Sequence, residues 1–194
     1  MVKHSRRIGR IAAVLTAAAV AVAVAAPVTA APLEQGTFHD EFSFIDPDFC
    51  GAGLTVRFDG VVDGRFLVTR RGRVGLVYFM ENVHITETVT NLANGNSVSD
   101  ESRTVQKDLH VIDNGDGTLI ILVLATGNFV LYGANGQAIA HDSGQIRFEL
   151  LIDHGGTPGD PSDDVELDFT LVKESTGTND DVCAAAVAAL TAPV

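Results

Sequence analysis

Apolar and polar residues alternate with a period of two over several stretches of the chain. The alternation is clearest in 165–171, where the odd positions are apolar and the even ones polar, and similar patterns run through 146–152 and 54–59. Successive side chains of a strand point to opposite faces, so each stretch predicts a strand with one face in a core and the other in water. Segment 119–125 is apolar throughout. It predicts either a central strand covered on both sides or one that lies under the C-terminal segment.

Dipeptides typical of tight hairpin turns separate these stretches, because each contains residues that tolerate a positive φ. They are Asp63-Gly64, Asn94-Gly95, Asn114-Gly115 and Asn135-Gly136. Four such turns predict a largely antiparallel meander, in which we expect eight to ten strands. Gly127 predicts a bulge or bend within a strand. Segment 153–165, rich in Gly, Pro, Asp and Ser, predicts one long loop.

The pattern as a whole predicts an all-β fold. We expect the strands to form a closed or nearly closed barrel, because closure removes the exposed edges of a sheet. A two-sheet β-sandwich is the alternative. After Val172 the composition changes, and residues 179–181 (Asn-Asp-Asp) predict the N-terminal cap of a short alanine-rich helix that runs through Leu190.

The N-terminus has the pattern of a signal peptide. Four basic residues and no acid occur in 1–10, an apolar run follows in 11–26, and small residues at Val28 and Ala30 suit signal peptidase. We therefore expect residues 1–30 to be removed before Ala31, which leaves 31–194 as a single secreted domain. An uncleaved membrane anchor is the alternative, because 11–31 approaches the length that spans a bilayer. Export by the general secretory route and export by the twin-arginine route both stay open.

The predicted mature chain is strongly acidic. Four of the 13 Lys and Arg residues lie in the signal peptide and none of the 25 Asp and Glu do, so nine basic residues face 25 acidic ones and the formal net charge is −16. A surface of this sign repels nucleic acid and anionic lipid. We expect no nucleic-acid partner, and no membrane partner after signal cleavage.

Cys50 and Cys183 are the two cysteines of the chain, one near each end of the predicted domain. In a compartment outside the cytoplasm disulfides persist, so we expect these two residues to pair and to join the start of the fold to its end. Two free thiols or intermolecular pairs are the alternative.

Segment 38–44 contains a carboxyl group among phenylalanines, a pattern that indicates a ligand site. In a regular strand, Asp40 shares a face with Phe38, Phe42 and Phe44. A carboxyl group among aromatic rings has a raised pKa and serves as an acid or binds a polar group of a ligand. The alternative is an edge position from which Asp40 reaches water. We add Arg57 and Glu149 to the candidate ligand-binding residues, as ionisable partners.

The sequence predicts no metal centre and no cofactor. Asp160, Asp163 and Asp164 are weak candidates for a calcium site, because they offer oxygen ligands in one loop, but their spacing matches no standard calcium loop and solvated turns are the alternative. The histidines are scattered. The chain also contains no Gly-x-Ser-x-Gly elbow, phosphate loop or dinucleotide fingerprint, so an enzyme is unsupported.

The chain resembles a group of uncharacterised secreted actinobacterial proteins. The resemblance covers most of the predicted domain and is carried by VIDNGDGTL (111–119), GQIRFE (144–149) and DHGGTPGDPSDD (153–164). It implies secretion but no activity, ligand or catalytic residue. The pattern of strands is also similar to that of lipocalin-type and allene-oxide-cyclase-type barrels, which is an analogy of fold.

Three functions are compatible with these observations. The first is a secreted barrel that binds a small, partly apolar ligand in its interior or mouth. The second is an extracellular protein-interaction or envelope-associated module without a ligand. The third is a barrel isomerase or cyclase that uses Asp40 or Glu149 with Arg57. Apolar positions on one face with a few polar ones among them would favour the first.

Overall fold

The structure is a computed structural model that describes residues 32–73 and 75–193. It consists of seven antiparallel strands, a short 3₁₀ helix at 161–163 and one C-terminal α-helix, which confirms the all-β prediction and the terminal helix. The elements are β1 (Glu34–Phe49), β2 (Leu54–Arg71), β3 (Leu76–Asn91), β4 (Ser97–Asp113), β5 (Thr118–Tyr132), β6 (Ala138–Asp153), β7 (Val165–Lys173) and α1 (Val182–Thr191). The predicted signal peptide, 1–30, lies outside the described residues.

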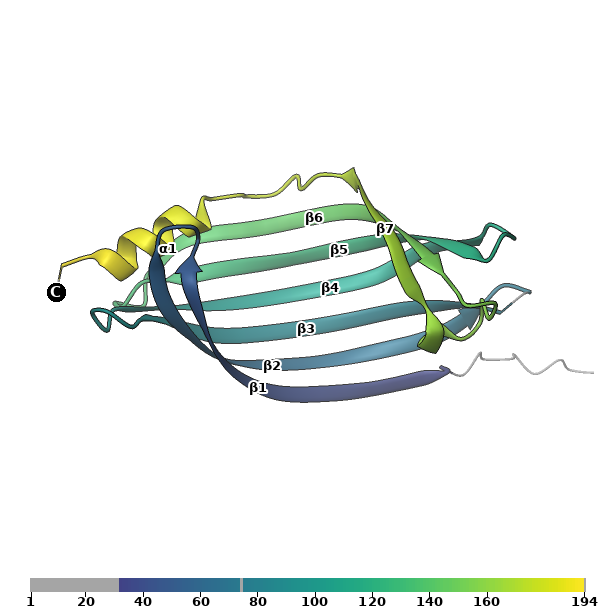
Figure 1. Cartoon of the computed structure of the whole chain (residues 1–194), viewed down its shortest axis with the longest axis horizontal. Helices are drawn as coiled ribbons and strands as arrows, with labels where there is room; N and C mark the ends of the chain where they lie inside the picture. The colour runs from purple at the N-terminus through teal and green to yellow at the C-terminus, as the bar shows by residue number, and fades with distance from the viewer. Residues whose placement is uncertain (1–31, 74, 194) are drawn as a thin grey trace, which may run out of the picture.

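The strands form one sheet in the order in which they occur along the chain (Figure 1). Each strand pairs with its sequence neighbours, so the predicted meander is confirmed. Among the described residues β1 and β7 do not pair, and the sheet is open. The structure thus shows the meander but does not show the closure of a barrel.

The sheet has seven strands rather than the eight to ten expected, and one of the four predicted turns is wrong. Asp63-Gly64 lies inside β2, where Gly64 pairs with Phe38 of β1 and with Val83 of β3. The chain turns at 50–53, where Gly51 and Gly53 have positive φ, and again between β2 and β3, where Gly72 and Gly75 do. The other three predicted turns are confirmed by their positions between strands.

The bulge expected at Gly127 is also absent. Gly127 pairs in regular register with Thr104 and Gly144, and the irregularity of β5 lies between Leu131 and Tyr132. A side chain at Gly127 would come within 2.7 Å of the Arg103 carbonyl oxygen. Glycine is therefore explained here by a lack of space rather than by a bend.

One core lies where α1 packs on the sheet. Ala186 and Leu190 of the helix are buried against Val56, Val89, Val98, Leu131 and Ala140. The helix has ten residues, which is too short to be stable in water without such packing.

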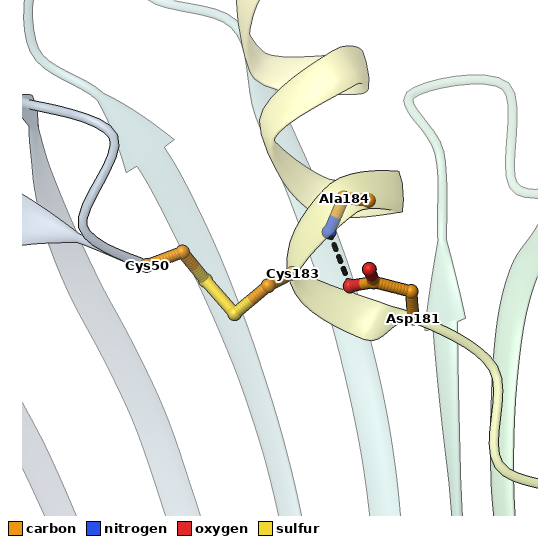
Figure 2. The surroundings of a disulfide bond; sticks show 4 residues. All are labelled: Cys50, Asp181, Cys183 and Ala184. Atoms are coloured by element: carbon orange, nitrogen blue, oxygen red, sulfur yellow. Dashed lines mark hydrogen bonds between the residues drawn. A yellow bond between two sulfur atoms is a disulfide. The ribbon is translucent and has the colours of Figure 1, made fainter.

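Both ends of α1 are attached to the sheet. Cys183 in its first turn forms the predicted disulfide with Cys50, at the tip of the β1–β2 hairpin, and Asp181 caps the helix by accepting a hydrogen bond of 2.8 Å from the Ala184 amide (Figure 2). At the other end, three asparagine side chains of the β3–β4 turn donate hydrogen bonds to the Leu190 carbonyl: Asn91, Asn94 and Asn96.

A second, smaller core lies at the opposite end of the sheet, where Val111, Leu119 and Ile152 are buried. β7 pairs with β6 at this end and every one of its residues is exposed, so its apolar side chains do not enter a closed core as predicted. From β7 the chain returns along the edge of β6 to α1, with a hydrogen bond of 2.9 Å from the Ser143 amide to the Thr178 carbonyl (Figure 1).

We predict that loss of the disulfide destabilises the protein by about 3–5 kcal/mol, because the bond closes a loop of 133 residues and restricts the unfolded chain. The measurement is the free energy of unfolding in urea for the wild type and for the Cys50→Ser, Cys183→Ser double variant. The reduced wild type should match the variant. A loss below about 1 kcal/mol would contradict a stabilising role for this bond.

Candidate functional site

The antiparallel register sorts the side chains of the sheet into two faces. On the face that α1 covers, which we call the phenylalanine face, lie nine of the ten phenylalanines of the chain. The tenth, Phe49, packs edge-on against Phe58 of the same face. The nine are Phe38, Phe42, Phe44, Phe58, Phe66, Phe79, Phe129, Phe148 and Phe169.

Several of these rings lie over glycines of the neighbouring strand. Phe38 pairs with Gly64 and Phe42 with Gly60, and a Cβ atom at either glycine would come within 2.4 Å of the ring that covers it. Rings from the edge strand β1 therefore lie over the backbone of β2. Phe38, Phe44 and Phe169 remain 36%, 52% and 51% exposed. Part of the aromatic surface of this face is therefore exposed rather than packed in either core.

The central strand β4 is polar on this apolar face. By register, five successive side chains of β4 point to it, and we call them the polar stripe: Asp100, Ser102, Thr104, Gln106 and Asp108. The neighbouring strands place Val83 and Ile85 on one side of the stripe and Ala125 on the other. Among the described residues the side chains of Ser102, Thr104 and Gln106 make no hydrogen bond, so their polar groups are available to a ligand.

A groove of about 360 Å³ lies beside the polar stripe, and its lining comes from β4, β5, β6 and the segment between β7 and α1. Gly127 and Gly144, which pair directly, line it and contribute no side chains. Ser175, from the segment that returns along β6, is also part of its lining. The remaining lining residues include Ser102, Thr104, Phe129, Asp142 and Ile146. This volume suits a small ligand, and the lining combines apolar groups with a few polar ones.

The two carboxyl groups at the ends of the stripe are desolvated. Burial and the neighbouring Glu87 carboxyl, which pairs with it across β3 and β4, raise the pKa of Asp100 to about 8. Asp100 is 6% exposed and lies beside the core under α1. Burial also raises the pKa of Asp108, whose carboxylate accepts a hydrogen bond of 2.7 Å from the Phe79 amide.

The opposite face, which we call the polar face, carries the histidines and most of the basic residues of the sheet. His39 bonds to Asp63 at 2.8 Å, and this bond raises the pKa of His39. His84 and Arg103 both contact Glu101, at 3.0 and 2.8 Å. Each of these carboxylates thus has a partner on the same face. Shallow grooves of about 860 and 580 Å³ cross this face.

The structure divides the predicted ligand-binding residues between the two faces. Asp40, Phe38 and Phe42 share the phenylalanine face, and Asp40 is exposed on the edge strand. Arg57 points to the polar face and bonds to Asp59 at 2.6 Å. Glu149 also points to the polar face, but it lies on β6. The acid and base of the proposed isomerase are therefore not brought together.

The three calcium candidates lie in the β6–β7 loop. Asp160 caps the 3₁₀ helix by accepting a hydrogen bond from the Ser162 amide, and Asp163 accepts one from the Thr157 hydroxyl. Repulsion from Asp163 adds to burial in raising the pKa of Asp164. In the described part of the chain no group of three or more His, Cys, Asp or Glu side chains is arranged to hold a metal ion.

Sequence reasoning missed the polar stripe, although its signal is visible. Segment 97–108 has only two apolar residues, Val98 and Val105, yet it continues the strand pattern of its neighbours. A polar strand is expected at an edge of a sheet, whereas β4 is the middle strand of seven. The polar residues of this segment are therefore notable because β4 lies in the middle of the sheet.

Comparison with protein-family models, with curated proteins and with solved structures finds no match to this chain. Among the helices in residues 32–73 and 75–193, none is long and apolar enough to cross a membrane. The Cys50–Cys183 disulfide fits an extracellular protein.

We predict that stability falls as the pH rises from about 4 to about 8, because native Asp100 keeps its proton up to about pH 8 whereas the unfolded chain releases it near pH 4. Below pH 4 both states are protonated, and above pH 8 the effect is constant. Asp100→Asn should remove this contribution, so its advantage over the wild type in free energy of unfolding should grow from pH 5 to pH 8.

The measurement is urea unfolding of both proteins at several pH values. Asp142→Asn, which changes an exposed carboxyl group on the same face, is the control and should leave the pH dependence unchanged. An advantage of Asp100→Asn that stays constant across the range would contradict the assignment.

Proposed function

We propose that this protein is an extracellular binding protein that holds a small, partly apolar ligand in the groove of the phenylalanine face. The polar stripe is the observation that carries the proposal. A sheet stabilised only by packing would present apolar side chains at the centre of an apolar face, because half-buried polar groups without partners cost free energy. Hydroxyl and amide groups at this position suit the recognition of a ligand.

The surroundings of the stripe support the same function. Phe129 and Ile146 offer apolar contacts to the body of a ligand, while Ser102 and Thr104 offer hydrogen bonds to its polar part. The fully buried residues of the two cores do not line the groove, and Phe129, which lines it, joins the groove to the core under α1. A curled, open sheet is sufficient for this function, and closure into a barrel would enclose the ligand further.

An interaction module without a ligand is the second candidate. The exposed apolar side chains of β7 favour it, because an edge strand with Leu167, Phe169 and Leu171 each about half exposed is a surface that a protein partner would cover. Register shifts against β6 interrupt this strand, however, and such bulges disfavour the addition of another strand. The groove with its polar lining therefore remains the better-supported site.

The ligand proposal predicts that the exported protein binds N-phenyl-1-naphthylamine, a neutral, largely apolar amine whose fluorescence rises in an apolar site. The measurement is a fluorescence titration. Thr104→Val keeps the shape of the side chain but removes the hydroxyl group, so we expect it to raise the Kd about 3- to 10-fold, the effect of one hydrogen bond.

Thr88→Val is the matched control, because Thr88 is exposed and points to the polar face. It should bind the dye as the wild type does. The proposal is wrong if the wild type gives no saturable rise in fluorescence, or if Thr88→Val weakens binding as much as Thr104→Val does.

A further inference from the structure

We infer that the ligand of this groove carries a positive charge, in the form of an amine or quaternary ammonium group on an apolar body. This inference rests on the binding function proposed above and adds the chemical class of the ligand. It follows from how the ionised side chains are distributed between the two faces of the sheet.

The basic side chains of the sheet point away from the groove. By register, Arg57, Arg65, Arg103, Lys107 and Arg147 lie on the polar face. On the phenylalanine face of strands β1 to β6, the described residues include one arginine, Arg70. It lies near the end of β2 and donates a hydrogen bond of 2.9 Å to the Gly159 carbonyl, so it is held at the loop beyond the sheet.

Carboxyl groups, by contrast, occur across the whole phenylalanine face. They come from three of its strands and lie on both sides of the polar stripe. Asp40, Glu81 and Glu87 lie on one side of the stripe, and Asp142 lies on the other. An anionic ligand would be repelled from this face, and a second copy of the chain would meet the same carboxylates with its own. A cation would be attracted.

Asp142 and Phe129 place a carboxylate and an aromatic ring together in the groove. The two residues pair directly across β5 and β6, so their side chains are neighbours on the same face, and both line the groove. In the described residues Asp142 forms no ion pair. A carboxylate beside an aromatic ring is a combination that binds ammonium groups, by charge attraction and, where the ammonium group lies over the ring, by the cation–π interaction.

The same row of cross-strand neighbours continues to the far edge of the sheet. It runs from Asp142 through Phe129, Ser102, Ile85 and Val62 to Asp40. A ligand whose ammonium group lies at Asp142 would therefore place its apolar body along Ser102 and Ile85. The hydroxyl group of Ser102 is in reach of a polar substituent on that body.

The test compares three probes that share one chain and differ in charge: octyltrimethylammonium, 1-octanol and octanoate. Each is titrated against the complex of the exported protein with N-phenyl-1-naphthylamine, and the concentration that displaces half of the dye is measured. We expect octyltrimethylammonium to compete about tenfold more strongly than octanoate, with octanol between them. The difference should shrink in 0.5 M salt, because salt screens charge interactions.

Asp142→Asn should reduce the preference for the cation to about threefold or less, measured as the ratio of the concentrations of octanoate and octyltrimethylammonium that displace half of the dye from this variant. Glu41→Gln is the matched control, since Glu41 is exposed on the polar face, and it should keep the full preference.

Equal competition by the cation and the anion, or a preference that Asp142→Asn leaves unchanged, would overturn the assignment of the ligand's charge. Binding of the dye in the same experiment would show that the groove still binds apolar ligands, so the failure of this inference is distinguishable from the failure of the proposed function.

Discussion

The register of the six strand pairs is the constraint on which the rest of the structure depends. Because antiparallel neighbours place directly opposed residues on the same face, a change of register by one residue would exchange the two faces. The β6–β7 pair has two register shifts, and the five pairs from β1 to β6 have three, between Asp46 and Phe49, between Asp108 and His110, and at Leu131. All three lie towards the ends of strands. The middle of the sheet, where the groove lies, keeps an unbroken register across β1 to β6.

This register also explains why the sheet tolerates a polar central strand. The two cores lie at opposite ends, one under α1 and one around Val111, Leu119 and Ile152, and each contains apolar residues contributed by several strands. β4 contributes Val98 to the first and Val111 to the second. Its polar residues occupy the stretch between the two cores. The buried apolar residues at the two ends of β4 hold the strand in the sheet, so its middle does not need apolar side chains.

Much of the fold could be predicted from the sequence, because its signals are local. The alternation of 165–171, the glycine turns after Asn94, Asn114 and Asn135, and the cap at Asp181 each act within a few residues. The disulfide was predictable because the chain has two cysteines and an export signal was expected. Asp63-Gly64 misled the prediction because its cause is not local: Gly64 makes room for the Phe38 ring of another strand.

The candidate site was predictable only in part, for the same reason. Asp40, Phe38 and Phe42 lie in one strand, so their common face could be inferred from spacing. The groove instead combines Thr104, Phe129, Asp142 and Ser175, from four segments whose proximity depends on strand order. The arrangement of Arg57 on the other face depends likewise on the pairing of β1 with β2.

The ionisable groups of the phenylalanine face are placed unevenly with respect to the groove. Glu87 and Asp100 are a neighbouring pair of carboxyl groups, but this pair lies beside the core under α1 rather than in the lining of the groove. Within the described lining the ionisable group is Asp142 alone, accompanied by hydroxyl groups and an aromatic ring. One carboxylate in such surroundings can hold a cation, by charge attraction and by the contact of the cation with the ring.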